Sequence, residues 1–214
     1  MRCELIRCGV ALAALLAAPA QAQDRPVFPP TRDVAVSYQS SLPEPNAPQN
    51  LTMRYSAASD RVRIEGSLQG GKLPGYVLFD HKSHHTTIVI EQLGLMMEAP
   101  RRGGLDQALV LENARHFDRL GRDTVAGLDC TVWAVDGESA SGTACVTADG
   151  VVLRAGGQDR KGRTASIEAT RVDYGRQAPA LFFPPATVHR LDLAAGPGGS
   201  GAAALLDRLR HGQP

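Results

Sequence analysis

Apolar and polar residues alternate along much of the chain after residue 33. Val34, Val36 and Tyr38 share one face of a first predicted strand. Residues 51–55 and 62–64 repeat this alternation on either side of a short polar turn, so together they predict a hairpin. The pattern is typical of an antiparallel sheet that buries one face and turns the other to solvent.

Further strands are predicted at residues 76–80, 86–91, 93–98, 128–135, 142–147, 151–155 and 164–174. Asp149-Gly150 is a strong signal for a tight hairpin turn, and the polar segment 156–162 predicts a longer hairpin loop. Residues 105–120 fit a helix and a strand equally well. The pattern therefore predicts a single mainly β domain of about ten antiparallel strands with little helix, or at most an α+β fold.

The first 22 residues have the pattern of a secretory signal peptide. Arg2 and Arg7 form a basic region, residues 8–18 form an apolar run, and the small-x-small sequence at residues 20–22 predicts cleavage after Ala22. The apolar run is too short to cross a bilayer, and no later stretch reaches roughly 18 uncharged apolar residues, so no transmembrane segment is expected. These features predict export to the periplasm.

Two of the four cysteines, Cys3 and Cys8, leave with this leader. The remaining pair, Cys130 and Cys145, lies on two predicted strands of one hairpin, so a single intramolecular disulfide is expected. A loop of this length contributes about 3 kcal/mol in the chain-entropy model. The cysteines lack the C-x-x-C spacing of a redox pair at a helix start, which favours a structural disulfide.

Charge and motifs exclude several functions. The chain has 23 basic and 22 acidic residues, and loss of the leader removes its net charge of +1. A near-neutral chain argues against nucleic acid or an anionic membrane as the main partner. The chain has no G-x-S-x-G elbow, H-E-x-x-H motif or phosphate loop, so we expect neither an enzyme nor a cofactor.

Two polar clusters leave alternatives open. His81, His84 and His85 are potential zinc or copper ligands, but the ligand set is incomplete, which favours a solvated connection over a metal site. Five basic side chains fall in predicted loops: Arg101, Arg102, Arg160, Lys161 and Arg163. Ordinary solvated charge is the simpler interpretation there, and contact with an anionic headgroup or a partner is the alternative.

Several stretches resemble the periplasmic lipoprotein-carrier (LolA/LolB-like) superfamily, in particular its small uncharacterised exported members. They are residues 33–38 (DVAVSY), 53–55 and 63–65, 77–80 and 87–90, Gly121 with 127–130, and 182–185 (FFPP). The resemblance covers roughly residues 31–193. It implies a strongly curved antiparallel half-barrel at residues 23–194, with a helix or loop covering a concave apolar face. A Gly/Ala-rich flexible tail follows at 195–214, and its apolar residues fit one or two turns of helix.

The resemblance also implies a function. We expect a non-enzymatic protein that binds a lipid or an acylated protein in the concave face, and the alternation suggests cavity-lining residues: Ile88, Ile90, Leu95, Met97, Val132 and Trp133. Alternation identifies the buried face without showing whether that face is hollow. An interaction module of the cell envelope with a filled core is therefore the alternative, and a metal site at the histidines is less favoured. The oligomeric state stays open.

Overall fold

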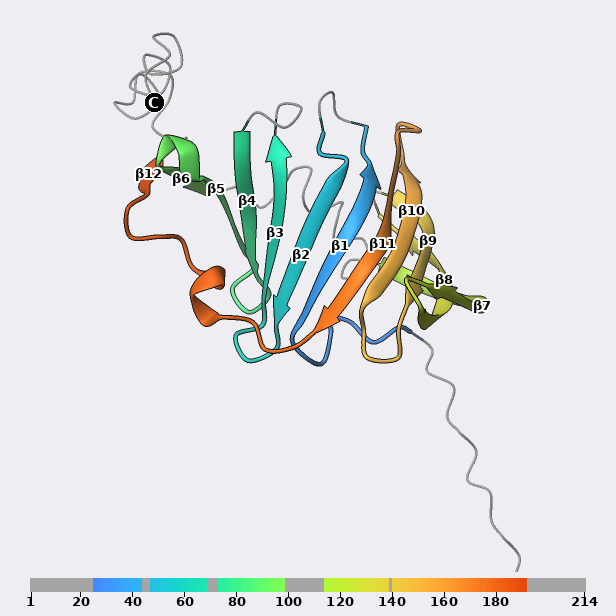
Figure 1. The fold of residues 1–214 in the computed structure, drawn as a ribbon. Helices are drawn as coiled ribbons and strands as arrows, with labels where there is room; N and C mark the ends of the chain where they lie inside the picture. Colours follow the sequence, from blue (N-terminus) through green and yellow to red (C-terminus); the bar gives the residue numbers. More distant parts are fainter. Residues whose placement is uncertain (1–24, 44–46, 69–72, 99–113, 139, 192–214) are drawn as a thin grey trace, which may run out of the picture.

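The computed structural model describes residues 25–43, 47–68, 73–98, 114–138 and 140–191. The predicted leader at 1–22 and the tail at 195–214 lie outside these ranges. The described residues form one open, curved sheet of twelve strands, so the mainly β prediction is confirmed (Figure 1). No helix in these ranges has the length and apolar character needed to span a membrane.

The sheet is antiparallel except at one edge. In chain order its strands are β1 (Val34–Ser41), β2 (Asn50–Ser56), β3 (Arg61–Leu68), β4 (Leu73–Asp80), β5 (His85–Ile90), β6 (Leu95–Glu98), β7 (Ala114–Val125), β8 (Leu128–Gly137), β9 (Ala140–Val146), β10 (Val152–Asp159), β11 (Thr164–Tyr174) and β12 (His189–Leu191). Two 3-10 helices, η1 (Glu91–Leu93) and η2 (Pro179–Phe182), interrupt them. The spatial order is β12-β6-β5-β4-β3-β2-β1-β11-β10-β9-β8-β7, and only β12 and β6 run parallel.

The pairing of β1 with β11 joins the two halves of the sheet, and the sheet bends there. The Tyr38 hydroxyl on β1 donates a hydrogen bond of 2.7 Å to the carbonyl oxygen of Val152, which lies on β10. The Tyr38 side chain therefore reaches across β11, on the face where buried residues of both halves meet. The sheet is curved, and we call the face that carries Tyr38 the concave face (Figure 1). Register shifts in the β1–β11 and β9–β10 pairs mark bulges, which increase local bend and twist.

The glycines at 156 and 157 correct one prediction. They lie inside β10, paired with both β9 and β11, and the turn begins only after Asp159. A Cβ at Gly142 on β9 would lie 2.1 Å from the Gly156 carbonyl oxygen. The two strands thus approach so closely that packing requires glycine at Gly142 and Gly157, whereas the sequence pattern alone suggested a loop at 156–162.

Two other boundaries change. Of the ambiguous segment 105–120, residues 114–120 belong to strand β7, and the rest lies outside the described residues. The strand predicted at 93–98 begins instead at Leu95, because Leu93 ends η1 and Gly94 adopts a left-handed conformation with φ of 61°. A residue with side-chain bulk rarely adopts that φ, so the strand starts after the glycine.

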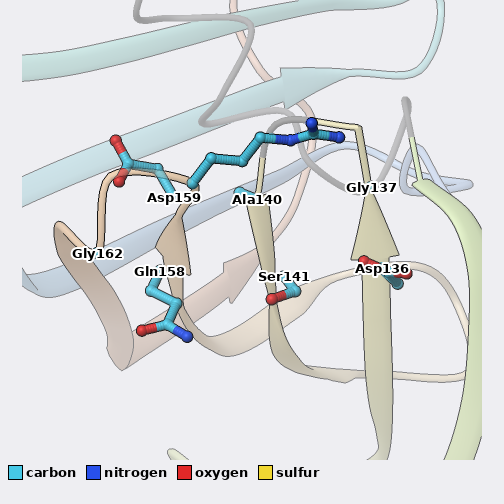
Figure 2. Close-up of a pocket in the computed structure, with 8 residues that line it drawn as sticks. Asp136, Gly137, Ala140, Ser141, Gln158, Asp159 and Gly162 are labelled. Atoms are coloured by element: carbon cyan, nitrogen blue, oxygen red, sulfur yellow. The ribbon is translucent and has the colours of Figure 1, made fainter.

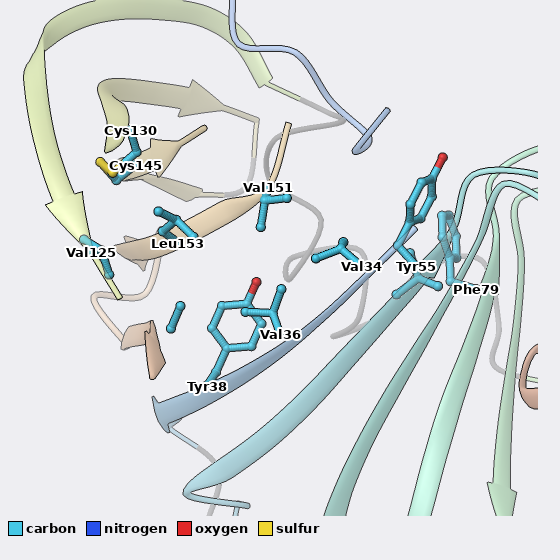
Figure 3. Packing of buried hydrophobic residues seen from close by; sticks show 12 residues of the cluster. Val34, Val36, Tyr38, Tyr55, Phe79, Val125, Cys130, Cys145, Val151 and Leu153 are labelled. Atoms are coloured by element: carbon cyan, nitrogen blue, oxygen red, sulfur yellow. A yellow bond between two sulfur atoms is a disulfide. The ribbon is translucent and has the colours of Figure 1, made fainter. Parts of the chain in front are cut away.

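The largest buried cluster lies where the halves meet. It joins side chains from β1–β4 with others from β7–β11 and with Val151, which directly precedes β10: Val34, Val36, Tyr38, Tyr55, Val62, Phe79, Val125, Cys130, Cys145, Leu153 and Ala169. The predicted disulfide between Cys130 and Cys145 is present and links β8 to β9, with 5.4 Å between the Cα atoms. Figure 3 shows Val151 and Leu153 among the disulfide and the β1 side chains, so the disulfide belongs to the core.

The chain's own C-terminal segment covers the other face of the sheet. Residues 175–188, which include η2, run from β11 to β12 across β2–β5 (Figure 1). Arg63 donates a hydrogen bond of 3.0 Å to the Leu181 carbonyl oxygen, and Phe182 is only 1% exposed. Val188 packs against a small buried cluster on the same face: Tyr76, Leu78 and Val89. The outer face of these strands is therefore already occupied.

Candidate functional site

A row of apolar side chains crosses the concave face from β2 to β6. Its members are direct cross-strand partners: Met53, Ile64, Val77, Ile88 and Met97. All five are half-buried, unlike the buried Val36 that continues the row on β1. Neighbouring strands lie about 4.8 Å apart, so the row makes an apolar strip about 19 Å long. We call it the apolar strip.

One end of the concave face is closed. The adjacent row toward that end consists of buried side chains: Val34, Tyr55, Val62 and Phe79. His81 packs edge-on against Phe79, with 4.7 Å between ring centroids, and against Phe28 of the N-terminal segment at 6.2 Å. The half-buried residues of the strip thus lie farther from the closed end than the buried row does.

An ion pair fastens the N-terminal segment at this closed end. The Thr31 amide donates to the Asp149 carbonyl oxygen at 2.9 Å, and Arg32 Nε lies 2.7 Å from the Asp149 carboxylate. Burial alone would raise the pKa of Asp149. Hydrogen bonds from Thr147, Arg32 and Tyr174, together with the Arg32 charge, outweigh that effect and lower the pKa. The carboxylate is therefore held in its charged form between the N-terminal segment and the β9–β10 turn.

Four of the six predicted cavity residues lie together. Ile88 pairs with Met97 and Ile90 pairs with Leu95, so these side chains share the concave face at the β5–β6 edge. All four are half-buried. Their role as the lining of a cavity stays a prediction.

The other two predicted residues lie elsewhere. Trp133 is on the concave face by register, through Ala144, Ala155 and Ile167, but it is 3% exposed and belongs to a separate cluster. Val132 precedes Trp133 on β8, pairs with Cys145 and packs against the main buried cluster, so its side chain leaves β8 on the face opposite to Trp133. Successive residues of a strand point to opposite faces, and the two cannot line one surface.

Three strip residues were not singled out from the sequence: Met53, Ile64 and Val77. The alternation assigned Met53 and Ile64 to the apolar faces of their strands, whereas residues 76–79 are all apolar and assigned no face to Val77. Which residues stand side by side depends on cross-strand register, and register follows from contacts between segments distant in the chain. The sequence therefore indicated apolar faces of single strands, but it did not indicate that their residues form one continuous strip.

The three histidines do not converge. His81 is half-buried among aromatic rings, while His84 and His85 are exposed. His85 Nδ1 lies 4.0 Å from a Glu98 oxygen. Within the described ranges, no group of three or more His, Cys, Asp or Glu side chains is arranged to hold a metal ion.

A polar groove lies where β8 and β10 end and β9 begins. Asp136, Ser141 and Gln158 are successive cross-strand partners there, on the face that also carries Val132 (Figure 2). Together with Gly137, Ala140, Asp159, Arg160 and Gly162 they line a volume of about 380 Å³. The groove therefore opens on the side of the sheet away from the apolar strip.

Comparison with known proteins finds the fold but no close relative. No protein-family model matches the chain, and no curated protein matches it. An uncharacterized conserved protein from Thermus thermophilus is 14% identical, with 75% of this chain and 91% of that chain covered at a TM-score of 0.52. At this identity the likeness shows the fold alone.

Two further solved structures match at lower TM-scores. A LolA superfamily protein from Nitrosomonas europaea is 10% identical, with 76% of this chain and 93% of that chain covered at a TM-score of 0.36. The MucA/MucB complex of Pseudomonas aeruginosa gives 12% identity, coverage of 76% and 59%, and a TM-score of 0.38. The superfamily that the sequence resembles is thus represented among the matching folds, and we draw no function from these similarities.

Proposed function

We propose that the protein is a non-enzymatic binding protein whose concave face holds a hydrophobic ligand, either a lipid or an acylated protein. The observation that carries this proposal is the apolar strip. In a filled core, neighbouring members of such a row are buried, whereas all five of these residues keep part of their surface accessible. Contiguous accessible apolar surface marks an interaction site.

The surroundings of the strip support the same proposal. Among the described residues, the C-terminal segment packs on the opposite face of β2–β5, whereas the strip on the concave face keeps part of its apolar surface accessible. The strip is about 19 Å long, and an acyl chain in one bilayer leaflet occupies about 15 Å. One extended acyl chain therefore fits along it.

We also infer that the protein works in the periplasm. The predicted signal peptide at residues 1–22 supports export. A buried disulfide is typical of proteins that fold in an oxidising compartment.

Binding of a fluorescent long-chain fatty acid tests the function. The full chain, expressed with its leader and purified from the periplasm without detergent, should bind the probe saturably. Replacing Ile88 on the strip with glutamine should weaken binding by about ten-fold, because a polar group then interrupts the apolar contact. The matched control is Thr87→Gln, which changes the same strand on the opposite face and should leave the affinity unchanged.

Mass spectrometry of lipid extracted from the purified wild-type protein provides a second measurement that does not depend on a variant. Co-purified lipid or saturable probe binding supports the proposal. Absence of both would contradict it and favour an interaction module with a filled core. Equal binding by Ile88→Gln and Thr87→Gln would place any lipid site away from the strip.

A further inference from the structure

The polar groove at the end of β8–β10 combines groups that fit a second kind of ligand. Its floor carries the carboxylate of Asp136, the hydroxyl of Ser141 and the amide of Gln158, side by side on three strands (Figure 2). Its rim is the β10–β11 turn, which contributes Arg160 and Gly162. A volume of about 380 Å³ lies in the range of small-molecule sites.

The β10–β11 turn is fixed by its own hydrogen bonds. The Asp159 carboxylate accepts bonds from the backbone amides of Lys161 at 2.8 Å and Arg163 at 2.9 Å, and another from Arg163 Nε. The backbone bond from Arg163 is the largest of the effects that lower the pKa of Asp159. Gly162 adopts a φ of 77°, which completes the turn. Arg160 is thus presented from an ordered turn, and the Asp159 charge is already engaged.

Two opposite charges in the groove have no ion-pair partner within the described part of the chain. They are the exposed side chains of Asp136 and Arg160. A carboxylate accepts hydrogen bonds from an ammonium group, and a guanidinium donates a pair of bonds to a phosphate or carboxylate. A simple anion would meet Arg160 but be repelled by Asp136. A molecule with both charges satisfies both groups.

We propose that this groove binds a small zwitterion, with its ammonium group on Asp136 and its phosphate or carboxylate on Arg160. Ser141 and Gln158 supply hydrogen bonds between the two charged ends. Because these groups are exposed and charge pairs in water are weak, the Kd is on the order of 1 mM. The site lies on the face away from the apolar strip, so it stands independently of the proposed hydrophobic ligand.

Chemical-shift titration of the isotope-labelled full chain tests this site. Glycerophosphoethanolamine and glycylglycine each carry both charges, and they represent a lipid headgroup and a peptide as sources. Either should produce saturable shifts at the amides of Ser141, Gln158 and Gly162. Binding of the first alone identifies a lipid headgroup, and binding of the second identifies free peptide termini. Glycerol phosphate and ethanolamine, with one charge each, should bind at least about five-fold more weakly.

Charge-removing variants complete the test. Arg160→Gln should weaken both zwitterions by about five-fold, and Asp136→Asn should do so while leaving glycerol phosphate binding no weaker. The matched control is Lys161→Gln, which removes a basic side chain of the same turn outside the groove lining and should change nothing. Failure of both zwitterions to give saturable shifts up to about 20 mM overturns the proposal, as does full binding in Asp136→Asn. Neither result bears on fatty-acid binding at the apolar strip.

Discussion

Among single residues, Asp149 connects parts of the chain that are far apart in sequence. Arg32 and Tyr174 both contact its carboxylate, with Nε of Arg32 at 2.7 Å and the Tyr174 hydroxyl at 3.2 Å. The Arg32 guanidinium also stacks over the Tyr174 ring, with its central carbon 3.7 Å from the ring centroid. One carboxylate thus ties the N-terminal segment to the end of β11.

This arrangement predicts a pH-dependent loss of stability in Asp149→Asn. The pKa of Asp149 is lower in the folded protein, so its stabilising effect is present above the unfolded value of about 3.9 and is lost as the pH falls through the folded pKa. At pH 7 the variant should be less stable by about 1 kcal/mol, the usual contribution of a hydrogen bond. Urea denaturation from pH 7 to pH 3 should show the difference closing below about pH 4.

Asp173→Asn is the control for this prediction. Asp173 pairs with Arg171 on the surface, where the two side chains are 52% and 72% exposed. Its loss should change the free energy of unfolding by less than about 0.5 kcal/mol. A difference between wild type and Asp149→Asn that persists unchanged at pH 3 would show that the carboxylate charge is not the cause.

At the scale of elements, the C-terminal segment depends on one buried side chain. Two consecutive phenylalanines lie there in different surroundings: Phe182 is 1% exposed, while Phe183 is 50% exposed and lies beside the Arg61 guanidinium. Arg61 also pairs with Asp80 at 2.7 Å, so the segment rests on a charged pair as well as on apolar contacts. Its attachment should therefore be sensitive to Phe182 far more than to Phe183.

Phe182→Ala should destabilise the protein by about 3 kcal/mol, because a large buried side chain leaves a cavity. Phe183→Ala should cost less than about 1 kcal/mol, since much of that ring remains in water. Urea denaturation of the two variants gives the comparison, and limited proteolysis should cut residues 175–188 faster in Phe182→Ala alone. Similar losses of stability in the two variants would show that Phe182 is not the attachment point.

The same scale shows what the sequence can predict. Strands β1–β3 and β8 and β11 were predictable because alternation is a local property, as at Val34, Val36 and Tyr38. The prediction of a loop at Gly156 and Gly157 was wrong, because glycine is found in closely packed strands as well as in loops. The apolar strip required the register of five strands, which is fixed by contacts between distant segments and has no local signature.

At the scale of the whole molecule, we expect the largest buried cluster to make the sheet unfold as one unit. It combines side chains of β1–β4 with those of β7–β11, so neither half of the described sheet has this core to itself. Leu153 on β10 is fully buried in it, close to the disulfide of β8–β9. Loss of one half would expose the apolar side chains of the other, which favours a single cooperative transition.

The single tryptophan makes this cooperativity measurable. Trp133 lies on β8, 3% exposed and outside the main cluster, and its fluorescence reports on that end of the sheet, while far-UV circular dichroism reports on all strands. With the disulfide intact, the two probes should give the same urea midpoint. Leu153→Ala should lower the free energy of unfolding by about 3 kcal/mol and shift both midpoints equally, because the cavity lies where the halves meet.

If the fluorescence transition preceded the dichroism transition, β7–β9 would unfold separately from β1–β6. The concave face would then be framed by two independent halves, and a ligand on the apolar strip would stabilise only one of them.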